Sequence, residues 1–231
     1  METGLVKQST FTTPRLADSP GLDMQSTRGA RRAEYLLVIY PNGDLQEKLK
    51  EEQQQFSTDY GLQMTVRNRP HITVAAFQAG EIMEDTLIRW VQRICNSYKS
   101  FELTLNNYSG FPPHTIYLRV QDPHPFRQLM QQLRSIDEFF RASGCPPANL
   151  ITRPFLSIAG GLTEQLYNKA MPEYSRKTFH DSFRVDELVL LKRTHSFDAC
   201  KTVNIFRLQP DIASLQPGAT DLSAALPPHH L

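Results

Sequence analysis

The chain has few of the features that mark secreted, membrane-spanning or metal-binding proteins. Its three cysteines, Cys95, Cys145 and Cys200, lie far apart and lack the spacing of metal ligands. Their odd number, together with the lack of a secretion signal, predicts a reducing, cytoplasmic location. No apolar run approaches the roughly 20 residues needed to span a bilayer. We therefore expect neither a membrane partner nor a metal.

The chain also lacks a strong excess of charge of either sign. Lys and Arg number 25 and Asp and Glu 24, which gives a net charge of +1 at pH 7. A general basic coat for nucleic acid is thus absent, and any contact with RNA must come from a local patch. With 40% hydrophobic residues in 231, the chain can form one large domain or two small lobes.

Composition divides the chain into three parts. Residues 1–33 are rich in Ser, Thr, Pro, Gly and Arg without periodicity, and we expect a disordered leader. Met24 lies inside this leader, so a start at Met1 and a start at Met24 both remain open. Strand and helix signals alternate over 34–208, and the Pro- and Ala-rich segment 209–231 predicts a flexible tail.

A strand pattern from Arg69 to Phe77 places a histidine beside a hydroxyl. The segment reads Arg-Pro-His-Ile-Thr-Val-Ala-Ala-Phe, and Pro70 suits the first residue of a strand. Successive side chains of a strand point to opposite faces. The alternation predicts one face formed by His71, Thr73 and Ala75 and another formed by Ile72, Val74 and Ala76.

A second segment, from Arg153 to Gly160, repeats this pattern. It reads Arg-Pro-Phe-Leu-Ser-Ile-Ala-Gly and begins 84 residues after the first. Ser157 takes the place of the threonine, whereas Phe155 stands where the first copy has its histidine. An interval of this length, filled with other strands and helices, predicts a duplicated lobe rather than a solenoid repeat.

Two His-x-Thr/Ser-x-hydrophobic strands, one per lobe, resemble the signature of the two-histidine phosphoesterases. This superfamily includes the 2',5' RNA ligase-like proteins and cyclic nucleotide phosphodiesterases, and the likeness covers roughly Tyr35 to Leu208. The order of strand and helix signals by itself favours a mainly antiparallel α+β fold. The resemblance adds a bilobal arrangement, with two mainly antiparallel sheets and flanking helices related by a pseudo-two-fold axis around a central cleft.

The resemblance implies metal-independent chemistry, without a cofactor, on RNA or a nucleotide with a 2',3'-cyclic, 2'- or 3'-phosphate end. In-line displacement at phosphorus needs a base on the attacking oxygen and an acid on the leaving oxygen. Imidazole, whose ordinary pKa is about 6.5, can serve as either. His71 would supply one of these groups, and the hydroxyls of Thr73 and Ser157 would stabilise the charge on phosphate oxygens.

Phe155 cannot transfer a proton, so the second half of the predicted site is incomplete. Three explanations for Phe155 remain open: a module that binds a nucleotide or RNA end without turnover, replacement of the histidine from elsewhere, and a substitution peculiar to this copy of the chain. The corresponding functions are a catalytically weakened phosphodiesterase or ligase, such a binding module, or a structural domain without a ligand. His114, His180 and His195 are candidates for the replacement. We expect His114 to open a strand that flanks the cleft, and His180 and His195 to lie in loops.

Other residues are candidates for substrate binding. Arg69 and Arg153, one ahead of each motif, can hold phosphates at the cleft mouth or pair with acids on the surface. Tyr117 and Phe155 can offer a stacking face to a base or pack in the core. The sequence leaves the natural substrate, the reaction direction and the oligomeric state open.

Overall fold

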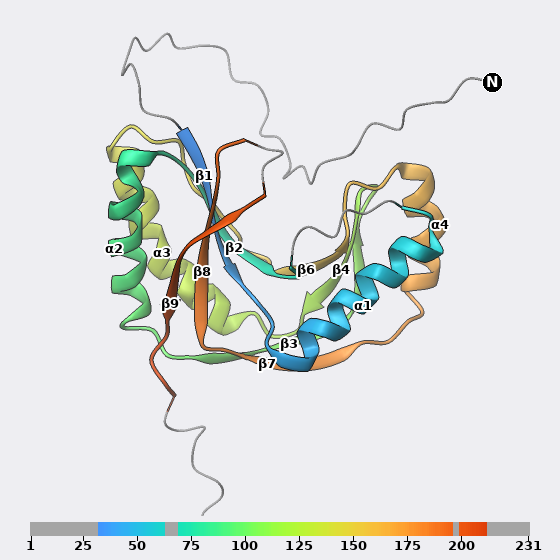
Figure 1. Ribbon diagram of the computed structural model, residues 1–231. Helices are drawn as coiled ribbons and strands as arrows, with labels where there is room; N and C mark the ends of the chain where they lie inside the picture. The colour runs from blue at the N-terminus through green and yellow to red at the C-terminus, as the bar shows by residue number, and fades with distance from the viewer. Residues whose placement is uncertain (1–31, 63–68, 196–198, 212–231) are drawn as a thin grey trace, which may run out of the picture.

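The computed structural model describes residues 32–62, 69–195 and 199–211 (Figure 1). The predicted leader up to residue 31, with Met24, and the tail from residue 212 lie outside the described residues. The elements in chain order are β1 (Arg32–Ile39), α1 (Gly43–Asp59), β2 (Ile72–Gly80), η1 (Glu81–Met83), α2 (Glu84–Cys95), β3 (Phe101–Phe111), β4 (Thr115–Val120), α3 (His124–Ala142), β5 (Asn149–Leu150), β6 (Phe155–Ala159), α4 (Glu164–Tyr174), β7 (His180–Val185), β8 (Glu187–Arg193) and β9 (Lys201–Arg207).

The strands form one curled antiparallel sheet with two matching halves. Its order is β7-β3-β4-β6-β2-β1-β8-β9, and the short strand β5 also pairs with β2. Four strands lie on each side of the junction between β6 and β2, so the motif strands are central and adjacent. The predicted α+β class and antiparallel two-lobed architecture are confirmed. The two expected sheets are joined at this junction into a single sheet.

The junction itself is narrow. Ile72 pairs with Leu156, and both side chains are fully buried. Helix α1 adds a polar contact at the second motif strand, because the Gln53 side-chain amide donates to the Ser157 carbonyl at 2.9 Å. Packing and α1 therefore hold the two motif strands together across a very short ladder.

Helices cover the outer side of the curled sheet (Figure 1). Helices α2 and α3 lie against one half, and α1 and α4 lie against the other. Buried side chains from all four helices, such as Leu49, Leu87, Leu129 and Tyr174, belong to one continuous core with Ile72 and its neighbours. None of the helices in the described part of the chain is long and apolar enough to cross a membrane.

The inner face of the sheet differs between the halves. Val38, Val189 and Leu191, on β1 and β8, form a separate small apolar cluster on this face. The inner face of the other half carries the second motif strand together with residues of β4. This difference places an apolar surface on one side of the junction and a mixed aromatic and polar surface on the other.

The predicted alternation along the first motif holds only as far as Val74. The register between β1 and β2 shifts there, and Ala75 pairs with Leu37. Both Val74 and Ala75 are consequently buried in the outer core, whereas Ala76 is partly exposed. The prediction that Ala75 shares a face with His71 is wrong, because this β-bulge inserts an extra residue and reverses the later side chains.

The prediction that His180 lies in a loop is also wrong, because the structure has a strand there. His180 begins β7, an edge strand that pairs with β3. Phe183 and Val185, two residues apart, are buried and fix this strand on the core. After β9 the chain stays attached as far as Asp211, since the Gln209 backbone bonds with Tyr98 and Ser100 at 2.9 and 2.7 Å.

Candidate functional site

Strand register brings the four motif positions together on one face. Strands β2 and β6 pair at Ile72 and Leu156, and continuing this antiparallel register by one residue each way sets His71 opposite Ser157 and Thr73 opposite Phe155. Directly opposed Cα atoms in such a ladder are about 4.5–5.5 Å apart. All four side chains are half-buried, whereas the alternating residues between them are fully buried in the outer core. The motif residues of both segments therefore belong to neighbouring strands that meet at the junction.

His71 is held in a defined tautomer. Its Nδ1 lies 2.8 Å from the Arg69 carbonyl, which can only accept, so Nδ1 carries the proton. Nε2 is then the nitrogen that can take or give a proton. Burial lowers the pKa of His71, although the hydrogen bond to Arg69 opposes the shift. The imidazole is thus neutral at pH 7, as a general base must be.

This lowered pKa gives a testable pH dependence. Because the unfolded pKa of histidine is about 6.5, the unfolded chain binds more protons than the folded chain just below that pH. The free energy of unfolding should therefore fall as the pH drops from 6.5 through the folded pKa, and this slope should weaken in His71→Gln. An NMR titration should place the His71 midpoint below 6.5. A midpoint at or above 6.5 would contradict the lowered pKa of this half-buried imidazole.

The hydroxyl of the second motif is buried without a partner among the described residues. Within the part of the chain that the structure covers, Ser157 Oγ makes no hydrogen bond, in contrast to most buried polar atoms. Leaving a buried hydroxyl unsatisfied costs about 1–3 kcal/mol. The Tyr174 hydroxyl, which also has no hydrogen-bond partner among the described residues, lies among the rings of Phe56 and Tyr108 in the outer core, whereas Ser157 is on the second motif strand. Rotation about the Ser157 side chain would direct its oxygen to a ligand on the inner face.

Two aromatic rings pack against Phe155, which stands where the first motif has its histidine. Phe111 stacks on Tyr117 with ring centroids 4.4 Å apart, and both rings lie 5.1 Å from the ring of Phe155. Tyr117 pairs with Ser157 across β4 and β6, so the cluster borders the motif residues directly. Phe111 is 41% exposed, which is unusual for a large apolar side chain and leaves it available for stacking. The sequence singled out Tyr117 and Phe155 but missed Phe111.

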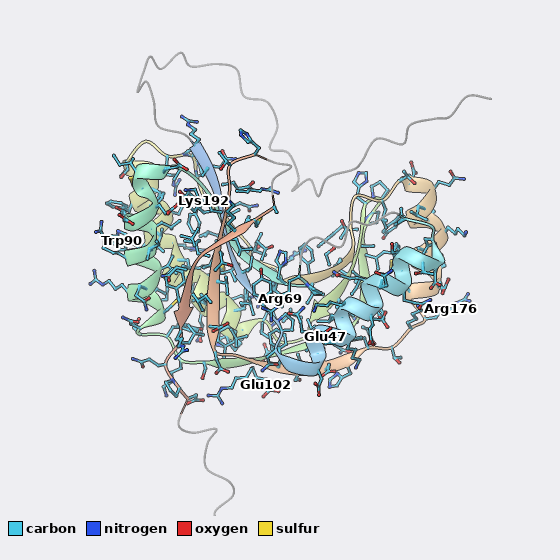
Figure 2. The ribbon with its side chains drawn as sticks, viewed as in Figure 1. Glu47, Arg69, Trp90, Glu102, Arg176 and Lys192 are labelled. Carbon is cyan, nitrogen blue, oxygen red and sulfur yellow. The ribbon has the colours of Figure 1, made fainter. Side chains whose placement is uncertain are left out.

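Arg69 lies near the middle of the molecule, where the two halves of the sheet meet (Figure 2). Its guanidinium carbon is 4.4 Å from the centroid of the Tyr40 ring, and its Nε donates to Gln46 Oε1 at 2.6 Å. Sequence reasoning missed Gln46 and Tyr40. Arg153, ahead of the second motif, is exposed, and none of its contacts within the described residues fixes its side chain.

The described residues show no ion pair for either motif arginine. A further cation, Arg119, pairs with Phe155 across β4 and β6 and is exposed. Residues two apart on a strand share a face, so the position of Arg119 two residues after Tyr117 could have identified it from the sequence.

The candidate replacement histidines lie away from Phe155. His114 precedes β4, five residues from Arg119, which corresponds to about 16 Å of strand. Its Nδ1 is 3.1 Å from the Leu162 carbonyl. His180 is three strands away from Phe155 in the sheet order, and His195 follows β8 in the other half. The register therefore puts none of these three opposite or next to Phe155.

Comparison with known proteins agrees with this architecture. The chain matches the 2'-5' RNA ligase superfamily over residues 45–196. No curated protein sequence matches it significantly.

Solved structures with a similar fold include LigT of E. coli complexed with 3'-AMP, at 18% identity and a TM-score of 0.54. That match covers 77% of this chain and 98% of LigT. Apo LigT gives 15% identity and a TM-score of 0.52, with 78% and 99% covered. TT0787 of Thermus thermophilus gives 12% identity and a TM-score of 0.50, with 77% and 99% covered. The family match, which spans most of the two-lobed region, shows that the chain belongs to the 2'-5' RNA ligase superfamily.

Proposed function

We propose that the chain binds the 2',3'-cyclic, 2'- or 3'-phosphate end of a nucleotide or RNA on the inner face at the sheet junction. His71 then promotes slow, metal-independent phosphodiester chemistry without a second histidine. The observation that supports this most directly is the register that sets His71 opposite Ser157 and Thr73 opposite Phe155. The structure of LigT with 3'-AMP, a relative in fold, is consistent with a ligand of this class.

In the hydrolytic direction, His71 Nε2 takes a proton from water as the water oxygen attacks phosphorus. One ring oxygen of the cyclic phosphate leaves and takes its proton from solvent, since Phe155 has none to give. Thr73 and Ser157 donate hydrogen bonds to the non-bridging oxygens and stabilise their developing charge. A positioned acid contributes roughly 10²–10⁴-fold to rate. Turnover should therefore be slower by about that factor than in a site with both histidines.

A second candidate function is binding without turnover. It is favoured by the aromatic cluster of Phe111, Tyr117 and Phe155, which turns the second half-site into a stacking surface. Stacking of one base on an aromatic side chain contributes about 1–3 kcal/mol to binding. In this alternative Phe155 retains the ligand by contact with its base, and His71 acts only as a hydrogen-bonding partner of the phosphate.

Binding of 3'-AMP, measured by calorimetry, tests the shared part of both candidates. Thr73→Val and Ser157→Ala should each weaken binding about 10- to 100-fold, because each removes a hydrogen bond to a charged oxygen worth about 1.5–3 kcal/mol. Thr104→Val, on β3 away from the motif strands, serves as a matched control. Saturable binding that is equally strong in all three variants would show that the phosphate lies elsewhere.

A further inference from the structure

We infer that Gln46 and Tyr40 fix the Arg69 guanidinium beside His71 as a second contact for the anionic phosphate of the ligand. Gln46 is then a positioning residue of the site, and Arg69 is the group that touches the ligand. This inference rests on the proposed function and adds to it a defined cationic subsite.

Gln46 connects α1 to the segment that carries His71. Its side chain is only 3% exposed, and its two polar atoms serve different partners. Oε1 accepts from Arg69 Nε at 2.6 Å, and Nε2 donates to the Pro70 carbonyl at 3.4 Å. The Arg69 carbonyl accepts from His71 Nδ1 in turn. One buried amide therefore supports both the arginine side chain and the backbone that orients the histidine.

Tyr40 packs against both the Arg69 guanidinium and the neutral His71 imidazole. Its ring lies under the Arg69 guanidinium at 4.4 Å and meets the His71 ring edge-on, with centroids 6.0 Å apart. A cation over an aromatic face is attracted to it, and the contact leaves the edges of the guanidinium plane open. Tyr40 thus restricts where the guanidinium can lie without using any of its N–H donors.

The donors that remain on Arg69 suit an anion. Nε is used by Gln46, which leaves the edge formed by Nη1 and Nη2, and this edge can bind two oxygens of one phosphate at once. No carboxylate among the described residues forms an ion pair with Arg69. Arg69 is itself exposed, so a ligand can reach it.

The chemical identity of Gln46 matters to this arrangement. A neutral amide satisfies Nε without cancelling the positive charge of the guanidinium. A glutamate in the same place would accept the same hydrogen bond but would pair with the charge and repel a phosphate. A leucine would fill similar space and release the arginine. Comparing glutamine, glutamate and leucine at position 46 therefore distinguishes the effect of orienting Arg69 from the effect of its positive charge.

The first experiment measures orientation in the free protein by the NMR signal of Arg69 Nε–H. A hydrogen-bonded Nε–H exchanges slowly and should be resolved in the unaltered chain and in Gln46→Glu. It should broaden or disappear in Gln46→Leu, whereas Gln53→Leu, which removes the other buried glutamine of α1, should leave it unchanged. Loss of the signal in Gln53→Leu as well would assign the effect to α1 as a whole and overturn the positioning role.

The second experiment measures calorimetric affinity for 3'-AMP and for adenosine. Arg69→Gln should weaken 3'-AMP about 10- to 100-fold, because it removes charge-assisted hydrogen bonds. Gln46→Leu should weaken it about three- to tenfold, the effect of ordering one long side chain during binding. Gln46→Glu should weaken 3'-AMP despite an intact Nε–H signal. Adenosine, which lacks a phosphate, should bind all variants alike, and Arg89→Gln on α2 controls for general charge.

The outcomes separate this inference from the proposed function. If the unaltered chain does not bind 3'-AMP, the proposed function fails and the subsite fails with it. If the unaltered chain binds, Thr73→Val weakens binding, and Arg69→Gln and Gln46→Leu bind as tightly as the unaltered chain, the proposed function stands and the Arg69 subsite is wrong.

Discussion

Replacing Phe155 with histidine is expected to raise the rate of 2',3'-cyclic nucleotide hydrolysis by about 10²–10⁴-fold. The new imidazole would lie opposite Thr73 and diagonally across the strand pair from His71. His71 is neutral and suited to act as base, so the second imidazole can supply the missing acid. The backbone carbonyl of Arg153 stands two residues before position 155, as the Arg69 carbonyl stands before His71. The Arg153 carbonyl can therefore accept a hydrogen bond from Nδ1 of the new histidine in the same way.

Two further variants make this result interpretable. Phe155→Leu removes the aromatic ring without adding a proton donor, and its rate should not rise. In the Phe155→His background, His71→Ala should lower the rate by about 10²–10⁴-fold, because it removes the base. If Phe155→His folds and binds 3'-AMP but hydrolyses no faster than the unaltered chain, the two motifs do not face one phosphorus atom as proposed.

Leu156→Ala is expected to lower the free energy of unfolding by about 2–5 kcal/mol, the usual range for truncating a buried leucine. Leu156 is fully buried and pairs with Ile72, the residue through which β6 meets β2, and with Leu118 on β4. The cavity would therefore open at the junction of the two halves. Denaturant unfolding, followed by both tryptophan fluorescence and circular dichroism, measures this loss.

Ile205→Ala provides the matched control for this variant. Ile205 lies on the outermost strand β9 and is 49% exposed, so its truncation should change stability by no more than about 0.5 kcal/mol. An effect of Leu156→Ala as small as that of Ile205→Ala would contradict the view that packing at the junction joins the halves. Because Trp90 lies on α2 in one half, separate transitions by the two probes would show that the halves unfold independently.

The sequence predicted the motif strands well, for identifiable physical reasons. A proline at the start of each segment, β-branched residues and a period of two all favour a strand, and the repeated pattern placed one strand in each half. The bulge at Val74 was not predictable, because Val-Ala-Ala contains only small or branched apolar residues that fit either face. Strand β7 was missed although Phe183 and Val185 show the period of two, since its other residues are polar.

The supporting residues of the site were harder to predict than the motif residues. Gln46 has the polarity of an exposed helix position, whereas its partner Arg69 lies 23 residues away in the sequence. Phe111 and Arg119 reach the site through the pairing of β3 with β4 and of β4 with β6. Such contacts depend on which strands are neighbours in the sheet, and the local sequence pattern does not predict the strand order.

The central claim is that the two motif strands form one phosphate site at the junction, and an NMR titration with 3'-AMP tests it most directly. In 1H–15N spectra, the account predicts saturable shifts of the backbone amides of His71, Thr73 and Ser157 with a common Kd. Adenosine should shift these amides much less. Saturable shifts confined to one motif strand, or located away from both strands, would contradict a site shared by the two halves.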